Sequence, residues 1–155
     1  MVHRERPEVY REKPEIYREK LWPSAWVFLA TALVIPASLL VFLPISPVAG
    51  VVSAVVMYGA IVVVLLATSP VIEVTDGMLR VGRARIERSY VGAVTAHRGA
   101  EATAERGVRL DARAYLLLRG WVDGVVRIEI TDDADPTPYW LVSTKNSDEL
   151  AAALT

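Results

Sequence analysis

The sequence of 155 residues contains no cysteine and only two histidines, His3 and His97. Without cysteine the chain can form neither a disulfide framework nor a thiolate nucleophile, and two histidines are too few for most zinc sites. It also contains no Gly-rich phosphate loop and no Gly-x-Ser-x-Gly elbow. We therefore expect no cofactor, no bound metal and no catalytic residue, and interpret the protein as one that is not an enzyme.

Neither sign of charge is in large excess, because 17 Lys and Arg stand against 18 Asp and Glu. Proteins that bind duplex nucleic acid gather Lys and Arg on one face. The charge balance therefore excludes nucleic acid as an expected partner.

Charged side chains are missing altogether between Lys20 and Glu73. One membrane crossing needs roughly 20 apolar residues, so the run is long enough for two, at about 22–43 and 48–68. Two prolines, Pro44 and Pro47, separate these segments and favour a turn. We predict a transmembrane helical hairpin over residues 21–70. A signal peptide has a shorter apolar region, and a soluble amphipathic helix would show a polar stripe.

The positions of basic residues predict the orientation of this hairpin. Lys and Arg flanking a span stay on the cytoplasmic side. They are plentiful in the N-terminal arm (residues 1–20) and after the second span, and absent from the turn at 44–47. We expect a multi-pass protein of the cell inner (plasma) membrane with both termini in the cytoplasm. Trp22 and Trp26 fit an aromatic anchor at the membrane interface.

The arm contains a tandem duplication of a seven-residue unit. Residues 7–13 (PEVYREK) are repeated as residues 14–20 (PEIYREK). A proline in each unit argues against one continuous helix. We expect the second unit to lie along the membrane with Tyr17 at the interface. The duplication itself is interpreted as a local repeat in a tail, with a binding motif presented twice as the alternative.

Residues 71–155 predict a small antiparallel β domain in the cytoplasm. Asp76-Gly77 and Asp123-Gly124 each lie between two strand-like stretches and favour type I′ hairpin turns. In 125–131, apolar and polar residues alternate as in a half-buried strand. Further strands are expected around Ile86 and at 91–97 and 139–144, and the chain closes with a short helix. The expected fold is an α+β membrane protein with a pleckstrin-homology-like barrel and a C-terminal capping helix; a split, helix-packed antiparallel sheet is the alternative.

Two sets of side chains are candidates for recognition. Arg119, Trp121, Asp135 and Tyr139 lie at predicted loop edges, where aromatic and charged groups suit partner binding; the alternative is that Trp121 fills the core and Asp135 caps a turn. The second set is a run of arginines close to the second span, which would attract anionic lipid headgroups but also satisfies the positive-inside rule. These candidate lipid-facing residues are Arg80, Arg83, Arg85 and Arg88.

Three stretches resemble a family of small actinobacterial membrane proteins that is catalogued only as a domain of unknown function. They are residues 17–24 (YREKLWPS), residues 114–119 (AYLLLR) with Trp121, and residues 135–144 (DPTPYWLVST). The resemblance extends from Ile16 onward, and the first copy of the repeat departs from it. It implies an integral membrane protein with two spans and no assigned activity.

These observations favour a non-catalytic, membrane-anchored module that presents its β domain at the cytoplasmic face for protein interaction. The expected partners are the lipid bilayer and a membrane or cytoplasmic protein; the sequence indicates no oligomeric state. An anionic-lipid-sensing module is one alternative, and an accessory subunit of a membrane enzyme or transporter is another. Transport by this chain alone is disfavoured because the predicted spans contain no ionisable side chain to mark an ion path.

Overall fold

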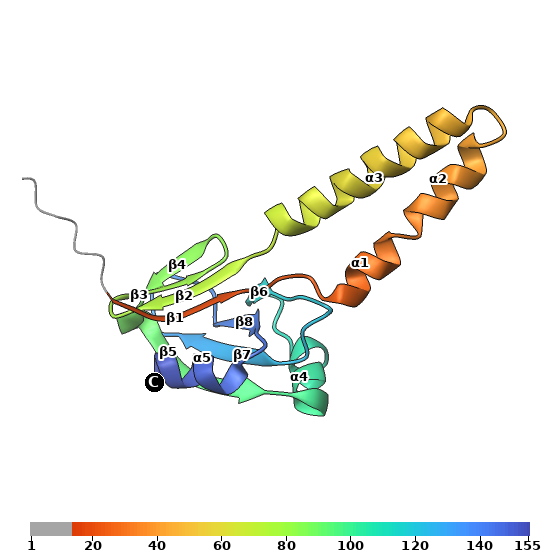
Figure 1. The fold of residues 1–155 in the computed structure, drawn as a ribbon. Helices are drawn as coiled ribbons and strands as arrows, with labels where there is room; N and C mark the ends of the chain where they lie inside the picture. Colours follow the sequence, from red (N-terminus) through yellow and green to blue (C-terminus); the bar gives the residue numbers. More distant parts are fainter. Residues whose placement is uncertain (1–13) are drawn as a thin grey trace, which may run out of the picture.

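The computed structural model describes residues 14–155, and the first copy of the repeat lies outside them. An apolar helical hairpin projects from a compact β domain (Figure 1). The hairpin consists of α1 (Ala25–Thr31), α2 (Val34–Phe42) and α3 (Pro47–Ala67). Residues 25–42 and 47–67 are each long and apolar enough to cross a membrane. The predicted pair of apolar helices is therefore confirmed.

Local sequence explains the shape of the hairpin. Pro36 has no N–H to donate to the carbonyl of Ala32, and the helix breaks between α1 and α2, where Ala32 O accepts from Ile35 N instead (2.9 Å). Ser46 caps α3 by accepting from Ala49 N (3.3 Å). Gly50 lets α2 approach closely, since a Cβ there would lie 3.4 Å from Leu39 Cδ2.

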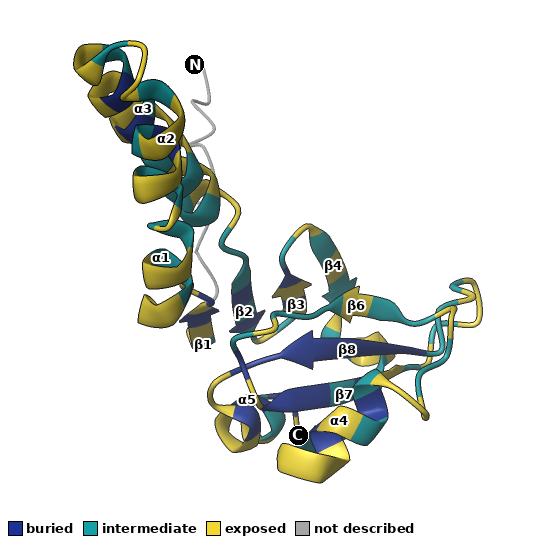
Figure 2. Ribbon diagram, turned by 90° about the vertical axis from the view of Figure 1, so that its right-hand side faces the viewer, coloured by how far each residue is buried: buried dark blue, intermediate teal, exposed yellow. Residues whose placement is uncertain are grey.

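The outer surface of the hairpin is apolar and uncovered. Leu40 and Ile45 are 77% and 78% exposed, and in Figure 2 the helices are mostly exposed or intermediate. A core helix of a soluble domain would be buried by its own chain. Within residues 14–155, no part of the β domain covers these helices.

The segment expected to lie along the membrane is instead a strand. It forms β1 (Glu15–Lys20) in an antiparallel sheet of order β1-β2-β3-β4. The other strands are β2 (Val71–Thr75), β3 (Met78–Val81) and β4 (Ala84–Glu87). Lys20 faces Val71, and Leu21 N donates to Pro70 O (3.0 Å). Because β1 precedes the hairpin and β2 follows it, one strand pair holds both ends of the hairpin.

A second sheet has the order β5-β7-β8-β6. Its members are β5 (Val91–His97), β6 (Tyr115–Leu117), β7 (Val125–Ile130) and β8 (Tyr139–Ser143). A 3-10 turn, η1 (Arg88–Tyr90), leads into it, α4 (Gly99–Arg106) follows β5, and α5 (Ser147–Leu154) ends the chain. The pairs β5–β7 and β7–β8 are antiparallel, but β6 and β8 are parallel.

The main core lies between the two sheets and α5. Ile72 and Val81 contribute from the first sheet, Ile128 and Trp140 from the second, and Leu150 from α5. The expected alternation in β7 is confirmed, because Val126 and Ile128 belong to this core. In Figure 2, β7 and β8 appear as the most buried strands. The α+β class and the C-terminal helix are confirmed. The pleckstrin-homology-like barrel is not, because the two sheets do not join into a closed barrel.

The other face of the second sheet is covered by α4 and the loop after it. Ala102 of α4 packs with Val125, Tyr139 and Leu141 in a smaller cluster. This layer buries β8 on both faces, and all five of its residues are buried.

The two Asp-Gly pairs have different structural roles. Asp76-Gly77 joins β2 and β3 as predicted, but the type I′ turn is wrong: among described residues only Gly82 and Gly99 have positive φ. The second predicted hairpin is also wrong, since β6 pairs with β8 and not with β7. A Cβ on Gly124 would lie 2.7 Å from Thr144 O. Glycine is therefore needed at this position for close backbone packing.

Candidate functional site

Tyr139, expected in an exposed patch, is a core residue. It is 2% exposed, and its hydroxyl accepts from the backbone N–H of Asp111 (2.8 Å). The guanidinium of Arg127 stacks on the ring, with Cζ 3.8 Å from the centroid. Tyr139 therefore holds the loop after α4 against the sheet and offers no surface to a partner.

Asp135 lies in the loop between β7 and β8. Its carboxylate accepts from Thr137 N (2.9 Å), and hydrogen bonds from Thr137 lower the pKa of Asp135. This is the turn-capping arrangement that was the alternative interpretation from the sequence.

Arg119 and Trp121 lie beyond the opposite end of β7, beside the hairpin. The guanidinium of Arg119 donates to Thr68 O (3.3 Å) at the C-terminal end of α3, where a cation is favourable. Its Cζ is 5.9 Å from the centre of the Trp121 ring. Trp121 Nε1 is buried and has no hydrogen-bond partner within residues 14–155. The structure brings these two residues together but separates them from Asp135 and from the buried Tyr139.

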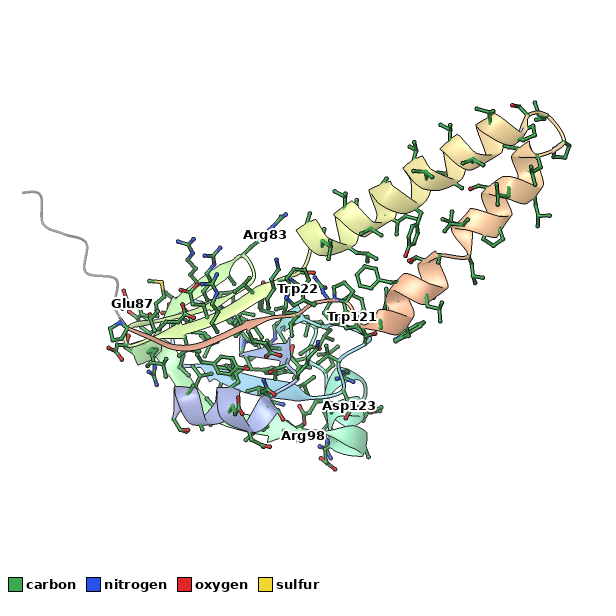
Figure 3. All side chains as sticks on the ribbon, viewed as in Figure 1. Trp22, Arg83, Glu87, Arg98, Trp121 and Asp123 are labelled. Atoms are coloured by element: carbon green, nitrogen blue, oxygen red, sulfur yellow. The ribbon has the colours of Figure 1, made fainter. Side chains whose placement is uncertain are left out.

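The four candidate lipid-facing arginines also separate. Arg80 and Arg85 face each other across β3 and β4 on the outer face of the first sheet. Arg83 lies in the turn between these strands. The preceding Gly82 is close to Pro70, since a Cβ added at Gly82 would lie 3.8 Å from Pro70 Cβ. Arg88 points elsewhere and donates to Ala153 O (2.9 Å) in the last turn of α5. Arg83 lies close to the end of α3 (Figure 3).

The outer face of the first sheet forms an open groove with a volume of about 1090 Å³. A cross-strand row of Arg18, Glu73, Arg80 and Arg85 runs over it. Arg18 pairs with Glu15 (3.6 Å), whereas within residues 14–155 no carboxylate lies within 4.0 Å of the Arg80 or Arg85 guanidinium. Like charges placed directly opposite each other are destabilising. The groove therefore carries two arginines that no described carboxylate pairs with, beside half-exposed Met78.

A second grouping, called here the base cluster, lies where the chain enters and leaves the hairpin. It consists of Lys20, Trp22, Arg83, Arg119 and Trp121. Lys20 Nζ is 4.1 Å from the centre of the Trp22 ring. Trp22 could be recognised from the sequence as an interfacial anchor. The position of Arg119 and Trp121 at the end of α3 depends on tertiary contacts and has no local sequence signal.

Two buried carboxylates are fully used by the fold. Glu19 of β1 accepts from the Tyr17 hydroxyl (2.7 Å), from Thr144 Oγ1 and from Lys145 N (2.9 Å). Burial raises the pKa of Tyr17 to about 12. Glu105 of α4 pairs with Arg127 (3.2 Å) and Arg109 (3.4 Å). Both carboxylates have donors that explain their burial, and their arrangement indicates structural roles.

The described residues contain no group of three or more His, Asp or Glu side chains placed to hold a metal ion. His97 is part-exposed, with Nε2 3.1 Å from Thr95 Oγ1. The surface features that remain on the described residues are the groove on the first sheet and the base cluster.

One comparison with known proteins gives a match. The family described as "Protein of unknown function (DUF3093)" matches residues 16–154, which confirms the resemblance to a domain of unknown function. No curated protein and no solved structure matches the chain. Because the match covers nearly the whole sequence, the chain belongs to the family described as "Protein of unknown function (DUF3093)".

Proposed function

We propose that this protein is a non-catalytic, membrane-anchored module. In this proposal residues 25–42 and 47–67 cross the inner (plasma) membrane as a hairpin, both termini are cytoplasmic, and the β domain binds a protein partner there. The length of both helices and their uncovered apolar side chains support the insertion. The absence of charge in the turn supports the orientation.

The observation that carries the proposal is the pairing of β1 with β2. A domain joined to a membrane by a flexible linker samples many orientations. Here the hydrogen bond from Leu21 N to Pro70 O extends the β1–β2 pairing to the residues that flank the hairpin, and Leu21 is fully buried. The β domain is therefore held in a fixed relation to the hairpin, which suits a module whose role is to present a surface.

The groove on the first sheet is the surface that we assign to the partner. Arg80 and Arg85, which have no carboxylate within 4.0 Å in the described part of the chain, would bind carboxylates of a protein segment, and Met78 adds apolar contact area. Arg and Met are enriched at interfaces between proteins. Glu73, opposite Arg80, also allows a basic side chain of the partner to pair there.

Site-specific photocrosslinking in intact cells tests this assignment. A photoreactive residue at Met78 is expected to trap one protein partner, and Arg85→Glu should reduce that adduct by reversing the local charge. The matched control is a photoreactive residue at Val108, which is 93% exposed and does not line the groove. If Met78 gives no adduct beyond those obtained at Val108, the groove is not a protein-binding surface.

The orientation can be tested separately because the chain contains no cysteine. Ser46→Cys, in the turn between α2 and α3, is expected to react with a membrane-impermeant maleimide in intact cells. Ala134→Cys, in the loop between β7 and β8, should react only after lysis. Reaction of Ser46→Cys only after lysis would show that the orientation is wrong.

A further inference from the structure

We propose that the base cluster binds the headgroups of anionic phospholipids in the leaflet next to the β domain. This adds a lipid-binding site to the module and rests on the proposed membrane insertion. The site differs from the candidate arginine set of the sequence: Arg83 remains, and Lys20 and Arg119 take the place of Arg80, Arg85 and Arg88.

The position of the cluster is the first argument. Lys20 and Trp22 lie on either side of Leu21, which pairs with Pro70 at the end of the hairpin. Arg119 contacts the carbonyl of Thr68, and the Gly82-Arg83 turn lies against Pro70. Figure 3 shows Arg83 near the end of α3, and Trp22 and Trp121 near the start of α1. For an inserted hairpin, this is the level of the lipid headgroups.

The charge of the cluster is the second argument. Elsewhere on the domain, Arg98 and Arg113 pair with aspartates at 2.7 Å and 2.9 Å. Within residues 14–155, no carboxylate lies within 4.0 Å of the charged groups of Lys20, Arg83 or Arg119. Three cations at the headgroup level therefore remain available for phosphate oxygens. The Arg119 guanidinium has five N–H donors and uses two side-chain nitrogens on backbone carbonyls.

The aromatic rings are the third argument. Two of the cations lie over tryptophan rings, Lys20 over Trp22 and Arg119 over Trp121. Indole rings are enriched at the membrane interface, where one part of the ring contacts acyl chains and the polar edge faces headgroups. The Trp121 Nε1 is buried in the domain, so Trp121 orients Arg119 and does not itself face headgroups. Trp22 is 47% exposed, which leaves ring surface for lipid. Cation and ring together match a lipid with an anionic head and an apolar body.

The test measures which lipids the full chain retains in a mixed bilayer. The protein is placed in nanodiscs containing equal amounts of phosphatidylcholine and phosphatidylglycerol, and bound lipids are identified by native mass spectrometry. Wild-type protein is expected to retain phosphatidylglycerol several-fold in excess over phosphatidylcholine. Arg83→Gln and Arg119→Gln should each lower this enrichment about fivefold, which corresponds to about 1 kcal/mol per basic residue near an anionic surface.

Arg98→Gln is the charge-matched control, because Arg98 lies on the far side of the domain from α3 (Figure 3). It should leave the enrichment unchanged. Arg83→Gln changes an exposed turn side chain that has no carboxylate within 4.0 Å among residues 14–155, so it remains informative if Arg119→Gln fails to fold. Unchanged enrichment in Arg83→Gln, or an equal loss in Arg98→Gln, would overturn the proposal. Extraction of the protein from membranes by alkaline carbonate would instead show that the hairpin is not inserted. That result would contradict the proposed function itself, whereas a failed lipid test with an inserted hairpin would contradict only the lipid site.

Discussion

Replacing Glu19 with alanine should destabilise the β domain more than the same change at Glu15, the other carboxylate of β1. The carboxylate is 9% exposed and accepts three hydrogen bonds, from Tyr17, Thr144 and Lys145. The bonds from Thr144 and Lys145 connect the strand before the hairpin to the junction of β8 and α5, whereas the bond from Tyr17 lies within β1. Removing the acceptor leaves the Lys145 N–H without its partner in the folded state, and the Tyr17 and Thr144 hydroxyls must turn to other acceptors.

The size of the effect follows from the number and kind of bonds. A hydrogen bond to a charged group contributes about 1.5–3 kcal/mol. The two hydroxyls can rotate toward other acceptors, so the three contributions do not add fully, and we expect a loss of roughly 3–5 kcal/mol. Glu19→Gln keeps one carbonyl acceptor and adds an amide N–H group whose hydrogen bond a hydroxyl oxygen can accept. It should therefore lower the free energy of unfolding by only about 1–2 kcal/mol.

Thermal unfolding of the detergent-solubilised full chain measures this loss. Near-UV circular dichroism reports on Trp140, whose ring lies 5.1 Å from that of Tyr115 in the core. For a domain of this size, 1 kcal/mol shifts Tm by roughly 4–8 °C, so Glu19→Ala should lower Tm by roughly 12 °C or more.

Glu15 supplies the control, because it lies on the same strand but its side chain is 42% exposed and pairs with Arg18 at 3.6 Å. Glu15→Ala should change Tm little, since an exposed ion pair contributes little to stability. A loss of less than about 4 °C for Glu19→Ala, which corresponds to about 1 kcal/mol, would refute the reasoning. An equal loss for Glu15→Ala would refute it too, since burial and the three hydrogen bonds of Glu19 would then make no difference.

Two further predictions concern packing and pH. Gly124→Ala should lower the free energy of unfolding by about 2 kcal/mol or more in the same assay, because the new Cβ would lie 2.7 Å from the backbone oxygen of Thr144. Gly120→Ala is the control and should be neutral or slightly stabilising, because a Cβ there has no neighbour within 4 Å. Equal Tm values for the two variants would contradict this. The pKa of Tyr17 is raised from 10.0 to about 12 in the folded protein, so its contribution to stability is fully present below pH 10 and is lost as the pH rises toward 12. Tyr17→Phe should therefore flatten the decrease in Tm between pH 10 and 12, and an unchanged slope would show that this phenol does not cause it.

The candidate sites show where sequence reasoning reached its limit. Arg119 and Trp121 stand close in sequence, and the structure keeps them together at the base of the hairpin. The sequence places Tyr139 in the same candidate site because it lies at a predicted loop edge, but α4 and Arg127 cover it. A residue that is buried by a layer on the far face of a sheet cannot be recognised from the pattern of apolar and polar residues around it in the sequence.

The sequence by itself determined the features that depend on neighbouring residues. The lack of charge between Lys20 and Glu73 specified two apolar helices, Pro36 specified the break in the first, and alternation specified the inward face of β7. These follow from periodicity and backbone chemistry within a few turns of chain.

Only the tertiary structure decided which distant segments meet. In the sequence, β1 is part of a charged arm with no strand signal of its own. It becomes a strand because β2, on the other side of the hairpin, forms its backbone hydrogen bonds, and because Thr144 and Lys145 donate to Glu19. Asp123-Gly124 reads as a turn, yet its glycine is required by the approach of Thr144 O. Hydrogen-bond partners and close contacts between residues far apart in the chain exist only after folding, so they determined how the hairpin is held and which cations gather at its base.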